Sequence, residues 1–411
     1  MRILWIKTEL LHPVDKGGKI RTYHMLKELR KFHHITYLTL DDGTGDPDAI
    51  EKANEYAHEV ITIPHRVSPK FTARFYAELG TNLFSSLPYF VSKYRSRRMK
   101  REIERLMTLG SFDVVICDFL VSSVNLPDQV SCPLVLFQHN VEAMIWRRHF
   151  ETAESRLKRA YLHDQWRRTV RFEKMTCRKF DAVVAVSPND ASLFANQYEI
   201  KNVYDVPTGV DLDYFTSPNG LGSQNPHLVF TGSMDWLPNH DAVMWFVDRV
   251  LPIIRKSFPD TALTVVGRDP FPSLLRQTKH DPLIRVTGRV TDIRPFMQEA
   301  GVYVVPIRIG GGTRLKLYEA MAMGLPIVST SVGAEGLPLS DGKELVLRDT
   351  AEDFAEAVVK LLKDRTFAKL LGSRAGERAR NEFGWPVVGD AFTQILIKVC
   401  SEANSQSCHV T

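Results

Sequence analysis

Short apolar runs rich in β-branched residues alternate with longer stretches of helical periodicity along almost the whole chain of 411 residues. The alternation begins with RILWI at 2–6 and a helical pattern over 17–31, and it continues as far as NVYDV at 202–206. Apolar strands separated by crossover helices are typical of parallel sheets whose two faces are covered. The pattern therefore predicts an α/β fold with a doubly wound, mostly parallel sheet.

A linker interrupts this alternation between residues 207 and 225, where VPTGVDLDYF and SPNGLGSQNP supply turn-forming residues. The alternation restarts with HLVFTG at 227–232 and predicts a second parallel sheet. A chain of this length exceeds the ~250–300 residues at which a single core stops growing. We therefore predict a first domain over 1–207, a second over 208–385, and a terminal helix and tail over 386–411 that packs on the first domain.

Charge and cysteine content limit the class of partner. The net charge of +5 is small for this length and favours an anionic ligand or an anionic membrane surface. The five cysteines include no Cys-x-x-Cys pair, so neither a disulfide framework nor a zinc site is indicated. The first residues lack the pattern of a secretory signal, and no run of ~18 apolar residues occurs. We expect a cytoplasmic protein, soluble or peripheral on the membrane, with no nucleic-acid partner.

The segment VYVVPIRIGGGTRLKLYEAMAMGLPIVST, at 302–330, carries the strongest chemical signal. A buried strand leads into a Gly-Gly-Gly turn, and a helix opens near Thr313 with Arg314 and Lys316 in its first turn. Cations at a helix N-terminus oppose its dipole unless an anion lies beside them, and a diphosphate would be such an anion. Glu319, further along the helix, could accept hydrogen bonds from ribose hydroxyls. The alternative is a glycine turn with two solvent-facing cations.

The run GGTRLKLYEAMAMGLPIVST, at 311–330, resembles the nucleotide-sugar signature of the family 4 retaining glycosyltransferases. Their GT-B fold has two facing Rossmann-like domains. Further similarity lies in DKGGKIRTYHML, FQHNVEAMIWRRH, FTGSMDWLPNHDAV and VVGRDP, and it extends over nearly the whole chain. The resemblance implies a hexosyltransferase that moves a sugar from a UDP- or GDP-linked donor to a hydroxyl of a glycan or lipid-linked glycan. It also implies retention of configuration and no metal or other cofactor.

The same resemblance assigns roles to individual residues. It implies that Arg314 and Lys316 hold the donor diphosphate, and that His139, at the end of the strand PLVLF, contacts the donor sugar. These three form the predicted catalytic set. The predicted donor-binding set comprises Gly17, Gly18, Asn140, Gly232, Arg268, Gly288, Val290, Gly311, Gly312, Thr313, Leu315 and Glu319. For Gly17 and Gly18 the alternative is a simple helix-entry turn, and for His139 it is a structural histidine at a strand end.

Two positions depart from the family pattern. Many members carry a glutamate eight residues before the one at Glu319, but here Gly311 stands at that position. Many also place an arginine and a lysine after the first strand of the second domain, where this chain has GSMDWLPNH. Two alternatives therefore stay open, a non-catalytic nucleotide-binding partner protein and a sugar-nucleotide epimerase. A dehydrogenase is disfavoured because TELLHPVDKGG, not Gly-x-Gly-x-x-Gly, follows the first strand.

Two further segments invite a functional interpretation. Asp211 and Asp213 imitate an Asp-x-Asp metal site, but they lie in the linker and are predicted to form a turn. Between 70 and 105, aromatic residues precede a segment rich in Arg and Lys. The periodicity predicts a helix over 91–109. Aromatic residues beside a basic helix suit an anionic membrane surface. The alternative is a subdomain with its own core and a solvated basic helix.

Overall fold

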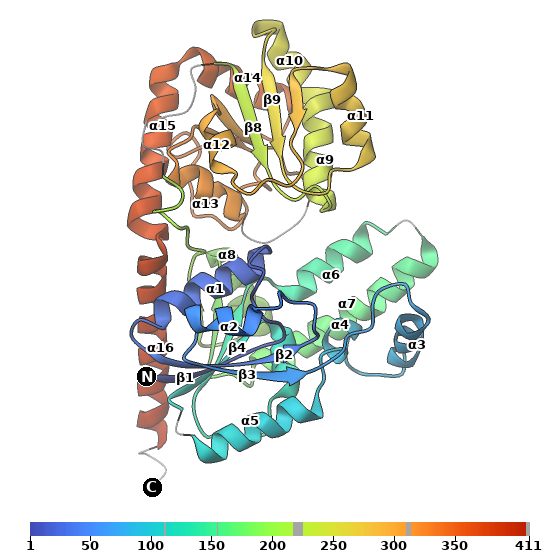
Figure 1. The fold of residues 1–411 in the computed structure, drawn as a ribbon, viewed down its shortest axis with the longest axis vertical. Helices are drawn as coiled ribbons and strands as arrows, with labels where there is room; N and C mark the ends of the chain where they lie inside the picture. Colours follow the sequence, from blue (N-terminus) through green and yellow to red (C-terminus); the bar gives the residue numbers. More distant parts are fainter. Residues whose placement is uncertain (111, 154, 217–224, 310–313, 408–411) are drawn as a thin grey trace. The chain divides into compact units, whose positions relative to one another are not determined.

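A computed structural model describes the chain except for residues 111, 154, 217–224, 310–313 and 408–411 (Figure 1). The chain divides into two compact units. Unit 1 comprises Met1–Pro207 and Val388–Thr411, and unit 2 comprises Thr208–Val387. Each unit has its own parallel sheet with helices packed on it.

Unit 1 is built on a seven-stranded sheet with the order β3-β2-β1-β4-β5-β6-β7. Every ladder between described strands is parallel, and the order reverses between β1 and β4, as in doubly wound folds. The inner strands are buried almost throughout, which explains their apolar sequences. The strands are β1 (Arg2–Lys7), β2 (His34–Asp41), β3 (Glu59–Pro64), β4 (Val114–Asp118), β5 (Leu134–Gln138), β6 (Ala182–Ala185) and β7 (Val203–Asp205).

The helices of unit 1 differ from the sequence prediction mainly in where they begin. The helix predicted over 91–109 begins at Arg97, because the Ser96 hydroxyl caps it by accepting the N–H of Met99 at 3.3 Å. The long helix begins at Arg156, and a separate helix precedes it. The helices are α1 (Gly17–Leu29), α2 (Ala49–Lys52), α3 (Ala73–Asn82), α4 (Tyr89–Ser92), α5 (Arg97–Leu109), α6 (Glu142–Glu151), α7 (Arg156–Cys177) and α8 (Pro188–Tyr198), with 3₁₀ turns η1 (Ala53–Glu55) and η2 (Leu120–Asn125).

Unit 2 repeats the same arrangement with six parallel strands in the order β10-β9-β8-β11-β12-β13. The strands are β8 (His227–Thr231), β9 (Ala262–Val266), β10 (Ile284–Val286), β11 (Val302–Val305), β12 (Ile327–Ser329) and β13 (Val346–Leu347). The predicted α/β class with two doubly wound parallel sheets is therefore confirmed.

The helix predicted over 240–257 is broken into three parts. A π-helical segment, η3 (Phe246–Val250), lies between two α-helices because Pro252 has no N–H to donate, and the N–H of Leu251 bonds to the carbonyl of Phe246. The helical elements of unit 2 are α9 (Leu237–Trp245), η3, α10 (Leu251–Ser257), α11 (Pro272–His280), α12 (Arg294–Gln298), α13 (Leu315–Ala322), α14 (Ala351–Lys363), α15 (Arg365–Arg378) and the π-helical η4 (Ala379–Phe383).

The last helix, α16 (Trp385–Ser407), belongs to unit 1 from Val388 onward. Phe392 on this helix packs against the rings of Trp5 and Phe137, with centroids 6.0 and 5.1 Å away. The helix therefore completes the core beneath β1 and β5.

Candidate active site

Three glycine turns lie together at the carboxyl ends of the strands of unit 2. Gly232 follows β8, and Gly267 and Gly288, which follow β9 and β10, form a bridge with each other. A Cβ added at Gly267 would lie 1.8 Å from the carbonyl oxygen of Gly232, so these two backbones touch directly. The edge formed by these turns is where open parallel sheets bind ligands.

Lys316, in the first turn of α13, reaches this edge with its ammonium group. Its Nζ donates to Asn239 Oδ1 at 3.0 Å and lies 4.0 Å from the ring centroid of Phe230, on β8. A Cβ at Gly232 would lie 2.6 Å from the same Nζ, so the position of the lysine requires a glycine there. Desolvation of the ammonium and the nearby charge of Arg314 lower the pKa of Lys316 to about 7.

Arg314 and Glu319 lie on either side of Lys316 along α13. Arg314 is the residue just before the helix, is only 6% exposed, and packs with its guanidinium carbon 5.2 Å from the ring centroid of Trp236. Desolvation raises the pKa of Glu319 to about 7, against the opposing effect of Lys316. The structure therefore differs from the alternative given in the sequence analysis, in which both cations face the solvent.

The other residues of the predicted donor-binding set in unit 2 are spread along the same edge. The Nε of Arg268 donates to the Ser233 hydroxyl at 2.8 Å and so holds the turn that follows β8. Gly288 has a φ of 70°, and the half-buried Val290 packs against the core of unit 2. Leu315 is the half-buried first residue of α13. Gly311, Gly312 and Thr313 lie outside the described residues.

Unit 1 holds a second cluster, centred on the fully buried carboxylate of Asp118 at the end of β4. Its Oδ2 accepts hydrogen bonds from Trp5 Nε1 at 3.0 Å, Lys7 Nζ at 3.0 Å and the Thr22 hydroxyl at 2.6 Å. Its Oδ1 lies 2.8 Å from Nε2 of His139. Although desolvation opposes ionisation, Lys7 and His139 hold the pKa of Asp118 well below its usual range.

His139 lies inside unit 1. It is 1% exposed, because its ring stacks on Phe119 at a centroid distance of 3.9 Å. Desolvation lowers the pKa of His139 to about 3, so the imidazole is neutral at pH 7. Nε2 lies 2.8 Å from the ionised Asp118, which favours the tautomer with the ring proton on Nε2 and Nδ1 as an acceptor. Neither ring nitrogen makes a hydrogen bond of standard geometry among the described residues.

The glycine pair at the start of α1 has a packing role beside this cluster. A Cβ added at Gly18 would lie 2.9 Å from Cζ of Phe119, a residue with a φ of 68°. A positive φ at a phenylalanine is strained and is found mainly at functional sites. Gly17 is the first residue of α1, and the half-buried Asn140 lies between β5 and α6. Gly18 thus permits close packing against Phe119, beyond a plain helix entry.

The sequence analysis missed Lys7, Thr22 and Asp118. A usable signal exists, because RILWIK and VVICD are apolar strands that each end in a charged residue, and the two charges are opposite. It also missed Glu173 on α7, whose buried carboxylate accepts the N–H groups of Glu142 at 2.8 Å and Ala143 at 3.1 Å. Glu173 therefore caps the helix that follows His139.

Comparison with known protein families finds a match in each half of the chain. Residues 16–214 match the model of Glycosyltransferase Family 4, and residues 225–364 match that of Glycosyl transferases group 1. The chain is a glycosyltransferase of the GT-B type. This glycosyltransferase is similar to HepE of Anabaena, which was solved in complex with UDP, with a TM-score of 0.69 and 13% identity over 97% of this chain and all of that one.

Two curated relatives add context. An uncharacterized 44.6 kDa protein in the cps region of Klebsiella pneumoniae is 20% identical over 88% of this chain and 91% of its own. The phosphatidyl-myo-inositol mannosyltransferase of Mycolicibacterium smegmatis is 30% identical over 46% of this chain and 50% of its own. The glycosyltransferase thus aligns with only half the length of that mannosyltransferase.

Two further observations concern metals and membranes. Asp211 forms a turn, as predicted, because its Oδ1 accepts the N–H of Tyr214 at 2.9 Å. The described residues contain no group of three or more His, Cys, Asp or Glu side chains placed to hold a metal ion. Among the helices of the described ranges, none is long and apolar enough to cross a membrane.

Proposed function

We propose that this glycosyltransferase moves a sugar from a UDP- or GDP-linked donor to a hydroxyl of a glycan or lipid-linked glycan, with retention and without a metal ion. The observation that carries the proposal is the pair Arg314 and Lys316, drawn together at the opening of α13 beside the glycine turns of unit 2.

Electrostatics at this helix end favour a diphosphate. Two partly desolvated cations lie at a helix N-terminus, where the potential is positive. Desolvation and the charge of Arg314 depress the pKa of Lys316. A diphosphate would restore the charge of the lysine, and it gains charge as the glycosyl bond breaks. Arg314, Lys316 and the helix amides would therefore stabilise the transition state more than the ground state.

Glu319 is proposed to hold the donor ribose, since it follows Lys316 by one helical turn. An ionised carboxylate accepts two hydrogen bonds, which suits the paired ribose hydroxyls. Binding of the diphosphate would raise the pKa of Lys316, and the charged lysine would in turn favour the ionised form of Glu319.

In unit 1, His139 is proposed to contact the donor sugar through Nδ1, the nitrogen that Asp118 leaves free to accept. Asp118 then acts as a positioning residue, because it fixes the tautomer and orientation of the imidazole. Similarity to a UDP-bound protein and to a phosphatidyl-myo-inositol mannosyltransferase supports the nucleotide-sugar donor and a lipid-linked acceptor. A lipid-linked acceptor would require the enzyme to work at the cytoplasmic face of an anionic membrane.

Release of nucleoside diphosphate tests the proposal. Purified enzyme is incubated with UDP- and GDP-sugars and a panel of lipid-linked glycan acceptors, with and without EDTA. We expect acceptor-dependent release that EDTA leaves unchanged and that Lys316→Met lowers by about 10²–10³. Equal release by Lys316→Met would contradict the assignment, and loss in EDTA that magnesium restores would contradict its metal independence.

A further inference from the structure

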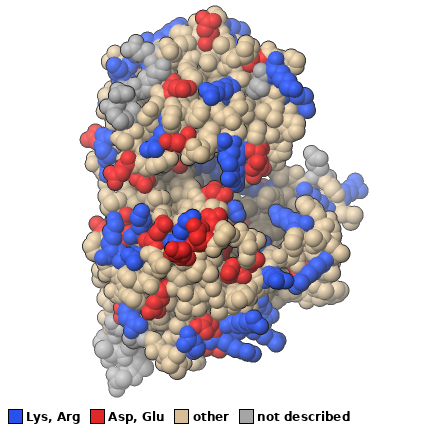
Figure 2. Space-filling model, viewed as in Figure 1, with Lys and Arg blue, Asp and Glu red and all other residues tan. Residues whose placement is uncertain are grey.

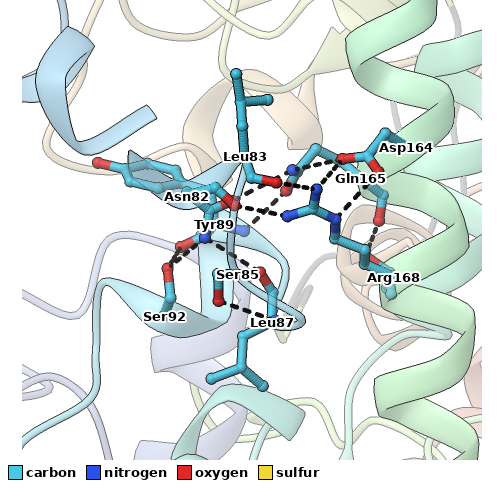
Figure 3. Close-up of polar contacts among 10 residues, drawn as sticks. Asn82, Leu83, Ser85, Leu87, Tyr89, Ser92, Asp164, Gln165 and Arg168 are labelled. Carbon is cyan, nitrogen blue, oxygen red and sulfur yellow. Dashed lines mark hydrogen bonds and ion pairs between the residues drawn. The ribbon is translucent and has the colours of Figure 1, made fainter. Parts of the chain in front are cut away.

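The loop that joins α3 and α4 exposes two large apolar side chains. Leu83 is 53% exposed and Phe84 is 95% exposed. In Figure 3 the side chain of Arg168, on α7, reaches this loop, where it donates to the carbonyl oxygens of Asn82 at 2.6 Å and Leu83 at 3.0 Å. An exposed phenylalanine is thus carried on a backbone that a second helix holds in place.

A buried polar network also holds the same loop in place (Figure 3). Asn82 donates from Nδ2 to the carbonyl of Leu87 and to the hydroxyl of Ser92, both at 3.1 Å. The fully buried Gln165 donates to Asn82 Oδ1 at 3.3 Å and accepts the N–H of Tyr89 at 2.8 Å. Satisfied buried networks of this kind specify one backbone conformation. The exposure of Leu83 and Phe84 is therefore a built feature of the fold.

A cavity of about 890 Å³ lies next to this loop, and Ser86 and Leu87 form part of its wall. Four cations line it: Arg95, Arg97, Lys100 and Lys179. Lys100 has a distant ion pair with Asp128 at 3.6 Å, but no ion pair within the described part of the chain involves the other three. We call this the basic cavity; it has far more positive than negative charge.

The basic cavity lies apart from the sugar-transfer residues. Its wall includes Leu134, at the amino end of β5, and Phe180, just before β6, whereas Asp118 and His139 lie at the carboxyl ends. It is therefore a separate site within unit 1.

The side chain of Asn125 fixes the start of α5 at the basic cavity. The N–H of Ser96 donates to Asn125 Oδ1 at 2.7 Å, which fixes the start of α5 with Arg95 and Arg97 on either side of the serine. The first turn of α5 holds no acidic residue, so its cations oppose the helix dipole. Figure 2 shows Lys and Arg side chains grouped at the lower edge of the view, where α5 lies in Figure 1. An anion in the cavity would offset both the excess of positive charge and the unfavourable interaction of these cations with the dipole of α5.

We propose that the basic cavity binds the phosphate headgroup of an anionic membrane lipid while Leu83 and Phe84 enter the apolar boundary of the same leaflet. The charge of the cavity complements a phosphodiester, and the adjacent apolar pair suits the acyl region that continues from it. The inference deepens the proposed transfer to a lipid-linked acceptor and rests on it for its biological purpose, while the binding itself can be measured alone.

Vesicle co-sedimentation of the full chain tests the proposal. The probes are vesicles of phosphatidylcholine alone and of phosphatidylcholine with an equal part of phosphatidylglycerol. The variants are Arg95→Glu/Arg97→Glu and Leu83→Ser/Phe84→Ser, and the control is Lys256→Glu/Lys363→Glu, which changes two exposed cations of unit 2 by the same charge. We expect wild type and control to bind only the anionic vesicles. We expect each unit 1 variant to bind them at least tenfold more weakly.

Several results would overturn the inference. If Arg95→Glu/Arg97→Glu binds vesicles as well as the control does, the basic cavity does not take part in membrane binding. If Leu83→Ser/Phe84→Ser binds as well as wild type, these two side chains do not insert into the membrane. Wild type that binds heparin or glycerol phosphate but no vesicle would show that the ligand is a soluble anion. Calorimetry with UDP and with GDP keeps the two proposals distinct. Vesicle binding without binding of either nucleotide would contradict the proposed function alone, and nucleotide binding without vesicle binding would contradict this inference alone.

Discussion

Nε2 of His139 lies 2.8 Å from Oδ1 of Asp118, and the two side chains come from the carboxyl ends of adjacent strands, β5 and β4. The second oxygen of Asp118 is bound by Lys7 and Thr22, so the carboxylate cannot turn away from the imidazole. This contact fixes which nitrogen of His139 accepts, and its consequences can be measured.

Asp118→Asn should lower kcat while it leaves nucleoside diphosphate affinity unchanged. The amide removes the negative charge that stabilises Nε2–H and leaves Lys7 without a counter-ion. Outer partners of functional histidines typically contribute about 10–100-fold, and we expect a loss of that order. Turnover measured beside UDP calorimetry checks this, with Glu104→Gln, an exposed carboxylate on α5, as the control. Wild-type turnover in Asp118→Asn would show that the contact does not position His139.

His139 should contribute a loss of stability as pH drops below about 6.5. In the unfolded chain the imidazole takes up a proton near pH 6.5, whereas in the folded chain its pKa is about 3. Between these values the unfolded state binds more protons, so acid favours unfolding by up to about 1.4 kcal/mol per pH unit. Denaturant titrations at pH 7 and pH 5 should show a smaller difference for His139→Gln than for wild type. An equal difference in both proteins would mean that the pKa of His139 is the same in the folded and the unfolded chain.

Gly232→Ala should weaken nucleotide binding with a modest loss of stability. The new methyl group would meet Nζ of Lys316 at 2.6 Å and Nδ2 of Asn239 at 2.7 Å, so the lysine must move from its present place. Gly80→Ala is the matched control, because its Cβ would meet nothing within 4 Å in the helix α3. Titration with UDP and thermal unfolding of both variants separate the two effects. If Gly232→Ala binds UDP as tightly as Gly80→Ala does, Lys316 does not hold the diphosphate.

Glu319→Gln should weaken the binding of UDP more than the binding of pyrophosphate. The amide has only one acceptor oxygen for the two ribose hydroxyls, a difference worth about 1–3 kcal/mol, whereas pyrophosphate carries no ribose. Calorimetry with both ligands gives the ratio directly. A variant that loses affinity for both ligands equally would place Glu319 in support of Lys316, with no separate contact to the ribose.

The sequence was sufficient for the fold because strand burial and crossover helices leave a regular pattern, as in RILWIK and HITYLTL. Helix starts were less predictable, since a single cap decides them. Ser96 begins α5 six residues later than the helical pattern does, and Pro252 breaks a continuous pattern into two helices. Local effects of this kind, a capping hydrogen bond or a missing N–H group, compete with hydrophobic periodicity. A prediction from periodicity alone cannot detect them.

For the site, the sequence indicated which residues carry chemistry but not their environments. Arg314 and Lys316 stood out because cations are unfavourable at a helix start. Their desolvation by Phe230 and Trp236 depends on side chains about 80 residues away along the chain, so no local pattern could reveal it. The burial of His139 likewise depends on the ring of Phe119, which stacks on the imidazole from another part of the chain.

The most direct test of the account is the proton balance of nucleotide binding. Lys316 has a pKa of about 7 without ligand, and a bound diphosphate would raise it. Near pH 7 proton release by Glu319 offsets part of this uptake, but above about pH 8 Glu319 is already ionised and Lys316 is mostly neutral, so each binding event should take up close to one proton. The affinity for UDP or GDP should therefore fall by up to about tenfold per pH unit between pH 8 and 9. Calorimetry in buffers of different ionisation enthalpy measures both quantities. We predict proton uptake and this pH dependence in wild type, and the loss of both in Lys316→Met together with weaker binding. If wild type and Lys316→Met bind the nucleotide equally tightly, and neither takes up nor releases a proton on binding, the assignment of the diphosphate to α13 is contradicted.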